Sequence, residues 1–383
     1  MRWNPRVLNQ RRVAGGVGSL AVLVLAVTLG LALMTGGQAA AGQTRTYYIA
    51  ADEVAWDYAP TGINQISGLP FDDEANVFVQ SGKNRIGKVY LKALYREYTN
   101  ATFSTLKPQD PKWQHLGTLG PLIRAEVGDT IKVVFKNNTR FTFSVHPHGV
   151  FYLKNSEGAP YNDGTSGVNK NDDLVPPGGT HEYNWPVPER AGPGPGDPSS
   201  ILWMYHSHVD EPGDTNAGLI GPIIITRRGS ANANGTPKDV DREFVTMFTV
   251  FDENRSPYLD HNIQTYAGQP ATVNPDDEGF IESNLMHSIN GYVFGNLPGL
   301  TMKEGEKVRW YLLGMGTEVD LHTPHWHGQT LLWNEMRTDI VELLPASMKV
   351  ADMVPDNPGI WLYHCNVNDH IDAGMLALFT VNP

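Results

Sequence analysis

Histidine is the residue type in this sequence whose spacing points most clearly to chemistry. Nine of the 13 histidines lie in four short clusters. The clusters are His146 and His148; His206 and His208; His322, His325 and His327; His364 and His370. Each lies in or at the end of a strand-like run, where residues i and i+2 point to the same face. A His-x-His pair therefore presents two imidazoles side by side on one surface.

The last cluster surrounds Cys365, the only cysteine of the chain. If His364 faces one side of a strand, Cys365 faces the apolar core on the other side, and Asn366 returns to the side of His364. His370 and Met375 then follow at intervals of five residues.

This order of residues predicts a metal site. A thiolate, two imidazoles and a weak thioether form a blue-copper electron-transfer site, and we expect His322 to supply the second imidazole. The alternatives are a buried structural cysteine beside a gap-filling methionine, or a cysteine nucleophile paired with histidine. Neither explains four potential ligands arriving in this order.

The clusters lie on two similar segments of chain. Residues 126–149 match residues 303–328, and residues 201–226 match residues 359–381. The places equivalent to His322, Cys365 and Met375 hold, in the first copy, Phe143, Ser207 and Leu219. The sequence therefore predicts a tandem duplication with a blue-copper site in the second copy only. The first copy keeps both His-x-His pairs, so the pairs serve another site, and converging imidazoles suit a copper cluster.

Composition and length indicate which secondary-structure elements position these residues. The chain of 383 residues is long enough for two domains, and 39 Gly and 27 Pro with only 18% charged residues indicate many short strands joined by turns. We predict an all-β fold. The polar, turn-rich stretch 229–241 is the expected linker between domain 1 (42–228) and domain 2 (242–383).

The first 41 residues have a basic start, a long apolar run and small residues before Gly42. This pattern is typical of an export signal, with an uncleaved N-terminal membrane anchor as the alternative. We expect an exported protein in the periplasm, outside the cell or at its surface.

The formal charge of −12 disfavours nucleic acid as a partner and favours cations.

The motifs "GTLGPLIRAEVGD" (117–129), "MYHSHVDEPGDTNAGLIGPIII" (204–225) and "INGYVFGNLPGLTMKEGEKVRWYLLGMGTEVD" (289–320) resemble the multicopper oxidases, and among them the ceruloplasmin and hephaestin group. The resemblance covers nearly the whole chain after residue 41. It implies two cupredoxin-like Greek-key β-barrels, a type 1 copper that accepts single electrons, and a trinuclear cluster that reduces dioxygen to water.

The resemblance also implies a role for each ligand. His322, Cys365, His370 and Met375 correspond to the type 1 ligands, and His146 and His325 to the type 2 pair. Of the two type 3 coppers, one corresponds to His148 and His206, and the other to His208, His327 and His364. The eighth cluster histidine is expected at position 366, where this chain has Asn366. Oxygen chemistry is therefore expected but weakened at one type 3 copper.

With two domains to a chain, the resemblance to small two-domain laccases implies a homotrimer with each cluster between neighbouring subunits; a monomer whose domains face each other is the alternative. The expected substrates are ferrous or cuprous ions, or phenols and amines. Asp339, Glu342, Asp369 and Asp372 are candidate carboxylates near the type 1 site, and Asp210 is a candidate proton relay or turn cap.

Two other functions stay open from the sequence. One is a copper-binding or electron-transfer protein disabled at Asn366, and the other is a copper nitrite reductase. The nitrite reductases carry type 1 copper in their first domain, whereas the expected ligands here lie in the second. The histidines outside the clusters are expected to be structural or surface residues: His115, His181, His261 and His287.

Overall fold

The computed structural model describes residues 42–317 and 320–383. The predicted signal or anchor, residues 1–41, lies outside the described residues. Among those that are described, no helix is long and apolar enough to cross a membrane.

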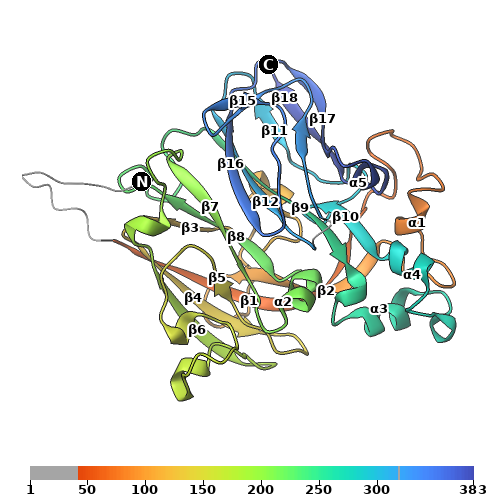
Figure 1. Ribbon diagram of the computed structural model, residues 1–383, viewed down its shortest axis with the longest axis horizontal. Coiled ribbons are helices and arrows are strands. Elements are labelled where there is room, and N and C mark those ends of the chain that lie inside the picture. The colour runs from red at the N-terminus through yellow and green to blue at the C-terminus, as the bar shows by residue number, and fades with distance from the viewer. Residues whose placement is uncertain (1–41, 318–319) are drawn as a thin grey trace, which may run out of the picture. The chain divides into compact units, whose positions relative to one another are not determined.

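The first half of the chain forms two sheets of four strands each (Figure 1). One has the order β2-β1-β4-β6 and the other β3-β8-β7-β5. Their bounds are β1 Thr44–Asp57, β2 Val89–Tyr98, β3 Ile123–Glu126, β4 Thr130–Asn137, β5 His146–Pro147, β6 Thr180–Pro186, β7 Ser200–His206 and β8 Ile220–Thr226. Side chains of β4 alternate between buried and half-buried, as expected for a strand with one face on a core.

The second half forms a sheet of six strands, β10-β9-β12-β16-β14-β15, and one of four, β11-β18-β17-β13. Their bounds are β9 Arg242–Asp252, β10 Leu285–Ile289, β11 Thr301–Lys303, β12 Val308–Gly314, β13 Pro324–Trp326, β14 Leu331–Trp333, β15 Met336–Thr338, β16 Ser347–Met353, β17 Gly359–Cys365 and β18 Leu376–Asn382.

The two halves repeat the same strand pairings. The parallel pairs β1–β4 and β3–β8 recur as β9–β12 and β11–β18. The antiparallel pairs β5–β7 and β7–β8 recur as β13–β17 and β17–β18. The predicted duplication and all-β fold are confirmed. The linker predicted at 229–241 lies between β8 and β9, and the domain bounds remain a prediction.

Short helices join the strands. The α-helices are α1 Asn76–Val79, α2 Glu211–Ala217, α3 Leu259–Tyr266, α4 Glu278–Ser283 and α5 Asn368–Asp372. The 3₁₀ segments are η1 Pro111–Leu116, η2 Lys154–Ser156, η3 Gly167–Lys170, η4 Glu189–Ala191, η5 Glu253–Arg255 and η6 Pro270–Thr272. Helices α2 and α5 occupy equivalent places, each following a histidine-bearing strand, β7 or β17.

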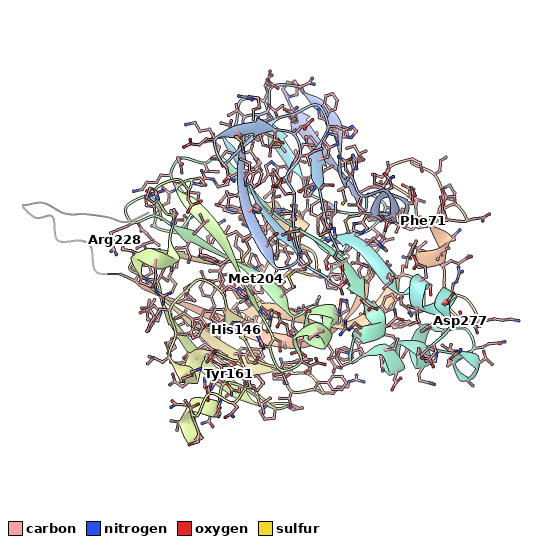
Figure 2. The ribbon with its side chains drawn as sticks, viewed as in Figure 1. Phe71, His146, Tyr161, Met204, Arg228 and Asp277 are labelled. Carbon is pink, nitrogen blue, oxygen red and sulfur yellow. The ribbon has the colours of Figure 1, made fainter. Side chains whose placement is uncertain are left out.

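Three apolar clusters make up the interior. One lies in the first half and also includes Tyr258, a second lies within the second half, and a third joins the halves. The third contains Met204 of β7, labelled in Figure 2, together with Met247 of β9 and Tyr311 of β12. Apolar burial contributes about 25 cal/mol per Å², so a shared cluster of this kind holds the halves together.

A buried ion pair also joins the halves. Lys92 of β2 donates to the Glu253 carboxylate at the start of η5, and both side chains are fully buried. Glu253 also accepts from the Tyr58 hydroxyl at 2.5 Å, while Lys92 donates to the Asn216 carbonyl of α2 at 2.8 Å. Burial lowers the pKa of Lys92 and raises the pKa of Glu253. Each charge therefore depends on its partner for stabilisation.

We predict that Lys92→Met lowers the free energy of unfolding by about 3–5 kcal/mol, because it leaves the Glu253 carboxylate buried without a partner. The matched double variant Lys92→Met/Glu253→Gln removes both charges and keeps an acceptor for Tyr58, so it should recover much of this loss. Urea unfolding of the three proteins measures the difference. Equal stabilities for the single and double variants would contradict an interior ion pair.

Candidate metal centres

Four histidines of the first half lie around the paired ends of β5 and β7. His146 lies opposite His206 in the strand register, and His148 and His208 follow them. The ligand nitrogens of His146, His148 and His206 all lie within 4.8 Å of one another. The chain turns after His148 at Gly149, whose φ is +76° and where a Cβ atom would lie 2.2 Å from the Trp203 ring.

Main-chain carbonyls orient two of these imidazoles. The Nδ1–H of His146 donates to the Glu157 carbonyl at 2.6 Å, and that of His206 to the Ser207 carbonyl at 2.9 Å. The peptide after Glu157 is itself held by buried Asp172, which accepts from the N–H groups of Glu157 and Gly158. Both rings therefore offer Nε2 to a metal, as ligating histidines commonly do.

The Nε2 atoms of His148 and His206 lie 3.0 Å apart. Imidazole–metal bonds are about 2.0 Å long, so two nitrogens at this separation can bind one ion. Burial lowers the pKa of each of these histidines to about 4, which keeps both rings neutral at neutral pH. Neutral imidazole is the form that binds metal.

The second half repeats this arrangement on β13 and β17. His325 lies opposite His364 in the register, and the Nε2 atoms of His327 and His364 lie 3.0 Å apart. His325, His327 and His364 form a second group within 4.8 Å. The Nδ1–H of His364 donates to the Cys365 carbonyl at 2.7 Å, which corresponds to the bond from His206 to Ser207. Burial lowers the pKa of His327 and of His364.

A third group lies on the other face of β17. His322, Cys365 and His370 are all buried, with ligand atoms within 4.8 Å. Cys365 Sγ lies 3.6 Å from His370 Nδ1 and accepts from the Thr323 N–H at 3.4 Å. Met375 is fully buried in the same apolar cluster as Cys365, and its N–H donates to the His370 carbonyl at 2.8 Å. The backbone thus holds Met375 beside the other three residues.

The donor set of the third group fits copper. The Nε2–H of His322 donates to the Met315 carbonyl at 3.2 Å, while its Nδ1 is buried without a partner. A buried nitrogen lone pair beside a thiol and a second imidazole is expected of a metal ligand. Burial also raises the pKa of Cys365, so a bound metal would be needed to favour its thiolate.

The equivalent place in the first half has no such donor set. Ser207 replaces the cysteine and donates to the buried Asp214 carboxylate at 2.6 Å. Phe143 and Leu219 are buried there as apolar residues. These contacts agree with the predicted absence of a blue-copper site from the first half.

The two histidine groups at the strand ends do not merge within one chain. Among the described residues, no set of three potential ligands within 4.8 Å draws on both groups. His208 lies outside the first triad, with its ring centre 5.1 Å from that of His146. Each group is therefore a partial set of ligands.

Four further candidate residues are not members of these three groups. Asp210 is the exposed residue before α2, and its N–H donates to Asp214. Asn366 is exposed just after β17, and its N–H donates to the Thr323 carbonyl at 3.2 Å. Asp339 lies 3.6 Å from His325 Nε2, and Glu342 is exposed.

Sequence reasoning missed Glu211, the first residue of α2. One of its carboxylate oxygens lies 3.3 Å from His208 Nε2, and the other lies 4.0 Å from His206 Nε2. The only signal in the sequence is its position three residues after His208. The neighbouring Asp210 is an equally good candidate in the sequence. Only the path of the chain into α2 shows which of the two carboxylates approaches the histidines.

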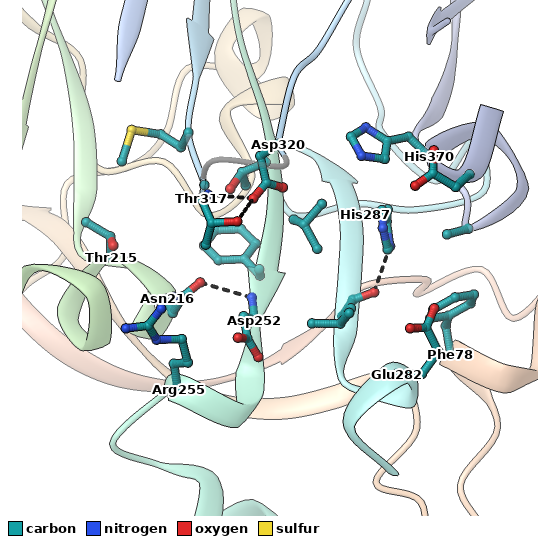
Figure 3. A pocket seen from close by; sticks show the side chains of 18 of the residues that line it. Phe78, Thr215, Asn216, Asp252, Arg255, Glu282, His287, Thr317, Asp320 and His370 are labelled. Carbon is teal, nitrogen blue, oxygen red and sulfur yellow. Dashed lines mark hydrogen bonds between the residues drawn. The ribbon is translucent and has the colours of Figure 1, made fainter. Parts of the chain in front are cut away.

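His287, one of the histidines expected to be structural or surface residues, lies beside the third group. Its ring centre is 5.2 Å from that of His370, and both rings line a pocket of about 920 Å³. In Figure 3 the two rings lie close together on one side of this pocket, with Asn216 and Arg255 on the other. Seven acids and one arginine line it, and the acids include the predicted candidates Asp369 and Asp372. Its full acidic lining is Glu74, Glu211, Asp252, Glu282, Asp320, Asp369 and Asp372.

Two family models, both described as multicopper oxidase, match residues 112–230 and 264–383. Human ferroxidase HEPHL1 is 49% identical over 342 residues, which cover 88% of this chain and 29% of that protein. Human hephaestin is 49% identical (89% and 29% covered), and human ceruloplasmin is 44% identical (88% and 30% covered). The chain thus spans about 30% of the length of these relatives.

Solved structures show the same fold at low identity. A copper nitrite reductase from Nitrosomonas europaea superposes with a TM-score of 0.55 at 16% identity, covering 89% of this chain and 94% of that one. A blue copper oxidase from the same organism superposes with a TM-score of 0.54 at 18% identity, covering 89% and 86%.

We predict that the copper-free protein loses stability as the pH falls from 6.5 towards 4. Burial lowers the pKa of each of five histidines to about 4, namely His115, His148, His206, His287 and His322. In the unfolded chain these groups take up protons near pH 6.5, so in this window the unfolded state binds more protons. Each contributes a loss of up to about 1.4 kcal/mol per pH unit.

Urea unfolding at pH 7.5, 6 and 5 measures this dependence. His115→Gln should flatten it, because His115 is buried beside Val245, whereas His261→Gln, at a half-buried position of α3, should change it less. A midpoint that stays constant between pH 7.5 and pH 5 would show that the buried histidines do not titrate in this way.

Proposed function

Because the chain belongs to the multicopper oxidase family, we propose that it is a copper oxidase that couples one-electron oxidation of a reducing substrate to the reduction of dioxygen to water. Copper supplies the redox chemistry when bound. The protein supplies the ligands, the path between the two kinds of site and the substrate pocket.

The observation that carries this proposal is the pair of adjacent residues His364 and Cys365. Their side chains leave β17 on opposite faces, one into the histidine group and one into the buried group with His322 and His370. The Nδ1–H of His364 also donates to the Cys365 carbonyl. One peptide unit therefore connects the buried group of Cys365, which would receive electrons from the substrate, with the histidine group of His364, which would pass them to dioxygen.

The proposed ligand roles are those that the resemblance to the family implies. His322, Cys365, His370 and Met375 would hold type 1 copper, and His146 and His325 would hold type 2 copper. The 3.0 Å pairs support the division of the type 3 ligands: His148 with His206 on one copper, and His327 with His364 on the other, joined by His208.

The separation of the two histidine groups supports assembly from several copies. Domain 1 (42–228) carries four cluster histidines and domain 2 (242–383) carries three, and the described part of the chain does not bring them together. A head-to-tail homotrimer closes each cluster between domain 1 of one copy and domain 2 of the next. The N-terminal 41 residues direct export of the protein.

The acidic pocket favours a metal cation as the substrate. Seven carboxylates and one guanidinium line it, and His370 borders it, so a cation held there would lie next to the type 1 site. His287 adds an imidazole to this wall. The relative HEPHL1 is named as a ferroxidase. We therefore propose ferrous or cuprous ions as substrates ahead of phenols and amines.

The structural likeness to a copper nitrite reductase concerns the fold alone, at 16% identity. The ligand set for type 1 copper lies in the second half of this chain, and seven histidines form the remaining groups. Both features favour the oxidase.

We predict that Glu282→Gln/Asp372→Asn raises the KM for ferrous ion about tenfold, or about 1.4 kcal/mol, because the pocket loses two negative charges. The KM for a neutral phenol should change little. Oxygen uptake with each substrate measures both constants. Glu342→Gln is the matched control, since Glu342 is exposed and lies outside the pocket. An equal rise for both substrates would argue against a cation site.

We predict that two inactive variants restore activity when they assemble together. His148→Ala disables the first histidine group, and His327→Ala disables the second. The two variants are co-expressed with different tags and purified on both tags, so that only mixed trimers remain. Every mixed trimer then contains one intact cluster out of its three. We therefore expect about one third of wild-type activity.

Light scattering checks the size of each assembly, and a doubly tagged wild-type protein serves as the control. Mixed assemblies of the correct size without activity would require each cluster to form within one chain.

A further inference from the structure

Position 366 leaves one copper short of a ligand. Under the proposed function, the copper held by His148 and His206 would take its third ligand from residue 366. The resemblance to the family implies a histidine at this position, and the chain has Asn366. An amide is a poorer copper ligand than imidazole, so either this copper binds weakly or another side chain completes its ligand set.

Glu211 is a group without an assigned role that lies close to His206 and His208. Its carboxylate oxygens lie 4.0 Å from His206 Nε2 and 3.3 Å from His208 Nε2. His206 Nε2 lies in turn 3.0 Å from His148 Nε2. The Glu211 side chain is 45% exposed, so it keeps the freedom to approach a bound ion.

The backbone around Glu211 is fixed on both sides. Before it, the buried Asp214 carboxylate accepts from the N–H groups of Val209 and Asp210 and from the Ser207 hydroxyl. After it, Lys92 holds the last turn of α2 by donating to the Asn216 carbonyl. The segment that carries Glu211 is therefore held on both sides by the buried groups Asp214 and Lys92.

We propose that the Glu211 carboxylate supplies the ligand that Asn366 does not, and so completes the copper site of His148 and His206. This proposal rests on the proposed function. Copper(II) accepts mixed nitrogen and oxygen ligand sets, so a carboxylate beside two imidazoles suits it. The exchange also adds one negative charge to the site, because a carboxylate stands in for a neutral imidazole.

The test is the copper content of Glu211→Gln, measured by atomic absorption, together with its copper(II) paramagnetic resonance spectrum. Losing a group that merely orients a ligand lowers metal affinity roughly 10- to 100-fold, and losing the ligand itself should cost at least as much. We expect one copper fewer per chain after dialysis, with an unchanged blue band. Glu74→Gln is the matched control: it removes one charge from the same pocket without touching a histidine, and it should keep its copper.

Asn366→His in the Glu211→Gln background provides the rescue. If the restored imidazole returns the lost copper, Glu211 had supplied that ligand. If Glu211→Gln retains its copper and its spectrum, Glu211 is not a ligand, and the proposal falls while the oxidase stands. If neither the natural protein nor Asn366→His binds copper beyond the blue site, the proposed function fails and Glu211 loses its role with it.

Discussion

The alternation of side chains along β17 is the constraint on which the candidate centres depend. Successive residues of a strand face opposite sides, so His364 and Cys365 cannot enter the same site. The register of β17 against β13 places His325 opposite His364 and Pro324 opposite Cys365. A slip of one residue would exchange the two faces and place the thiol among the imidazoles of the open histidine group. The pairing of β17 with β18 adds a second restraint on this register.

The contacts between the two halves are important because they form the wall of the acidic pocket and fix the position of α2. The third apolar cluster contains residues of both halves, and polar pairs add hydrogen bonds between them. Arg124 of β3 binds Glu243 of β9 through two hydrogen bonds of 3.0 and 2.8 Å. The Lys92–Glu253 pair extends to the end of α2 through the Asn216 carbonyl. Residues from both halves consequently line the acidic pocket that His370 borders.

Much of this architecture could be predicted from sequence, because it depends on short-range periodicity. The two-residue spacing of the histidines and the repeat of their surroundings were sufficient to predict the duplication. Ser207 in place of the cysteine was sufficient to predict that the first half lacks a blue-copper site. Glu211 and His287 could not be found in this way. Their roles depend on the direction of α2 and on the packing of β10 against α5, which bring together residues distant in sequence. Asp339 was expected near the blue-copper ligands, and its carboxylate lies beside His325 instead.

The central claim is that one chain carries one complete copper site and two partial ones that only a neighbouring copy completes. Anomalous X-ray scattering at the copper edge, from crystals of the copper-loaded protein, tests it most directly. The account predicts one copper peak enclosed by His322, Cys365 and His370 of a single chain. It predicts the remaining peaks between the His146 group of one copy and the His325 group of another. Peaks that lie wholly within one chain at either histidine group, with no second copy facing them, would contradict it.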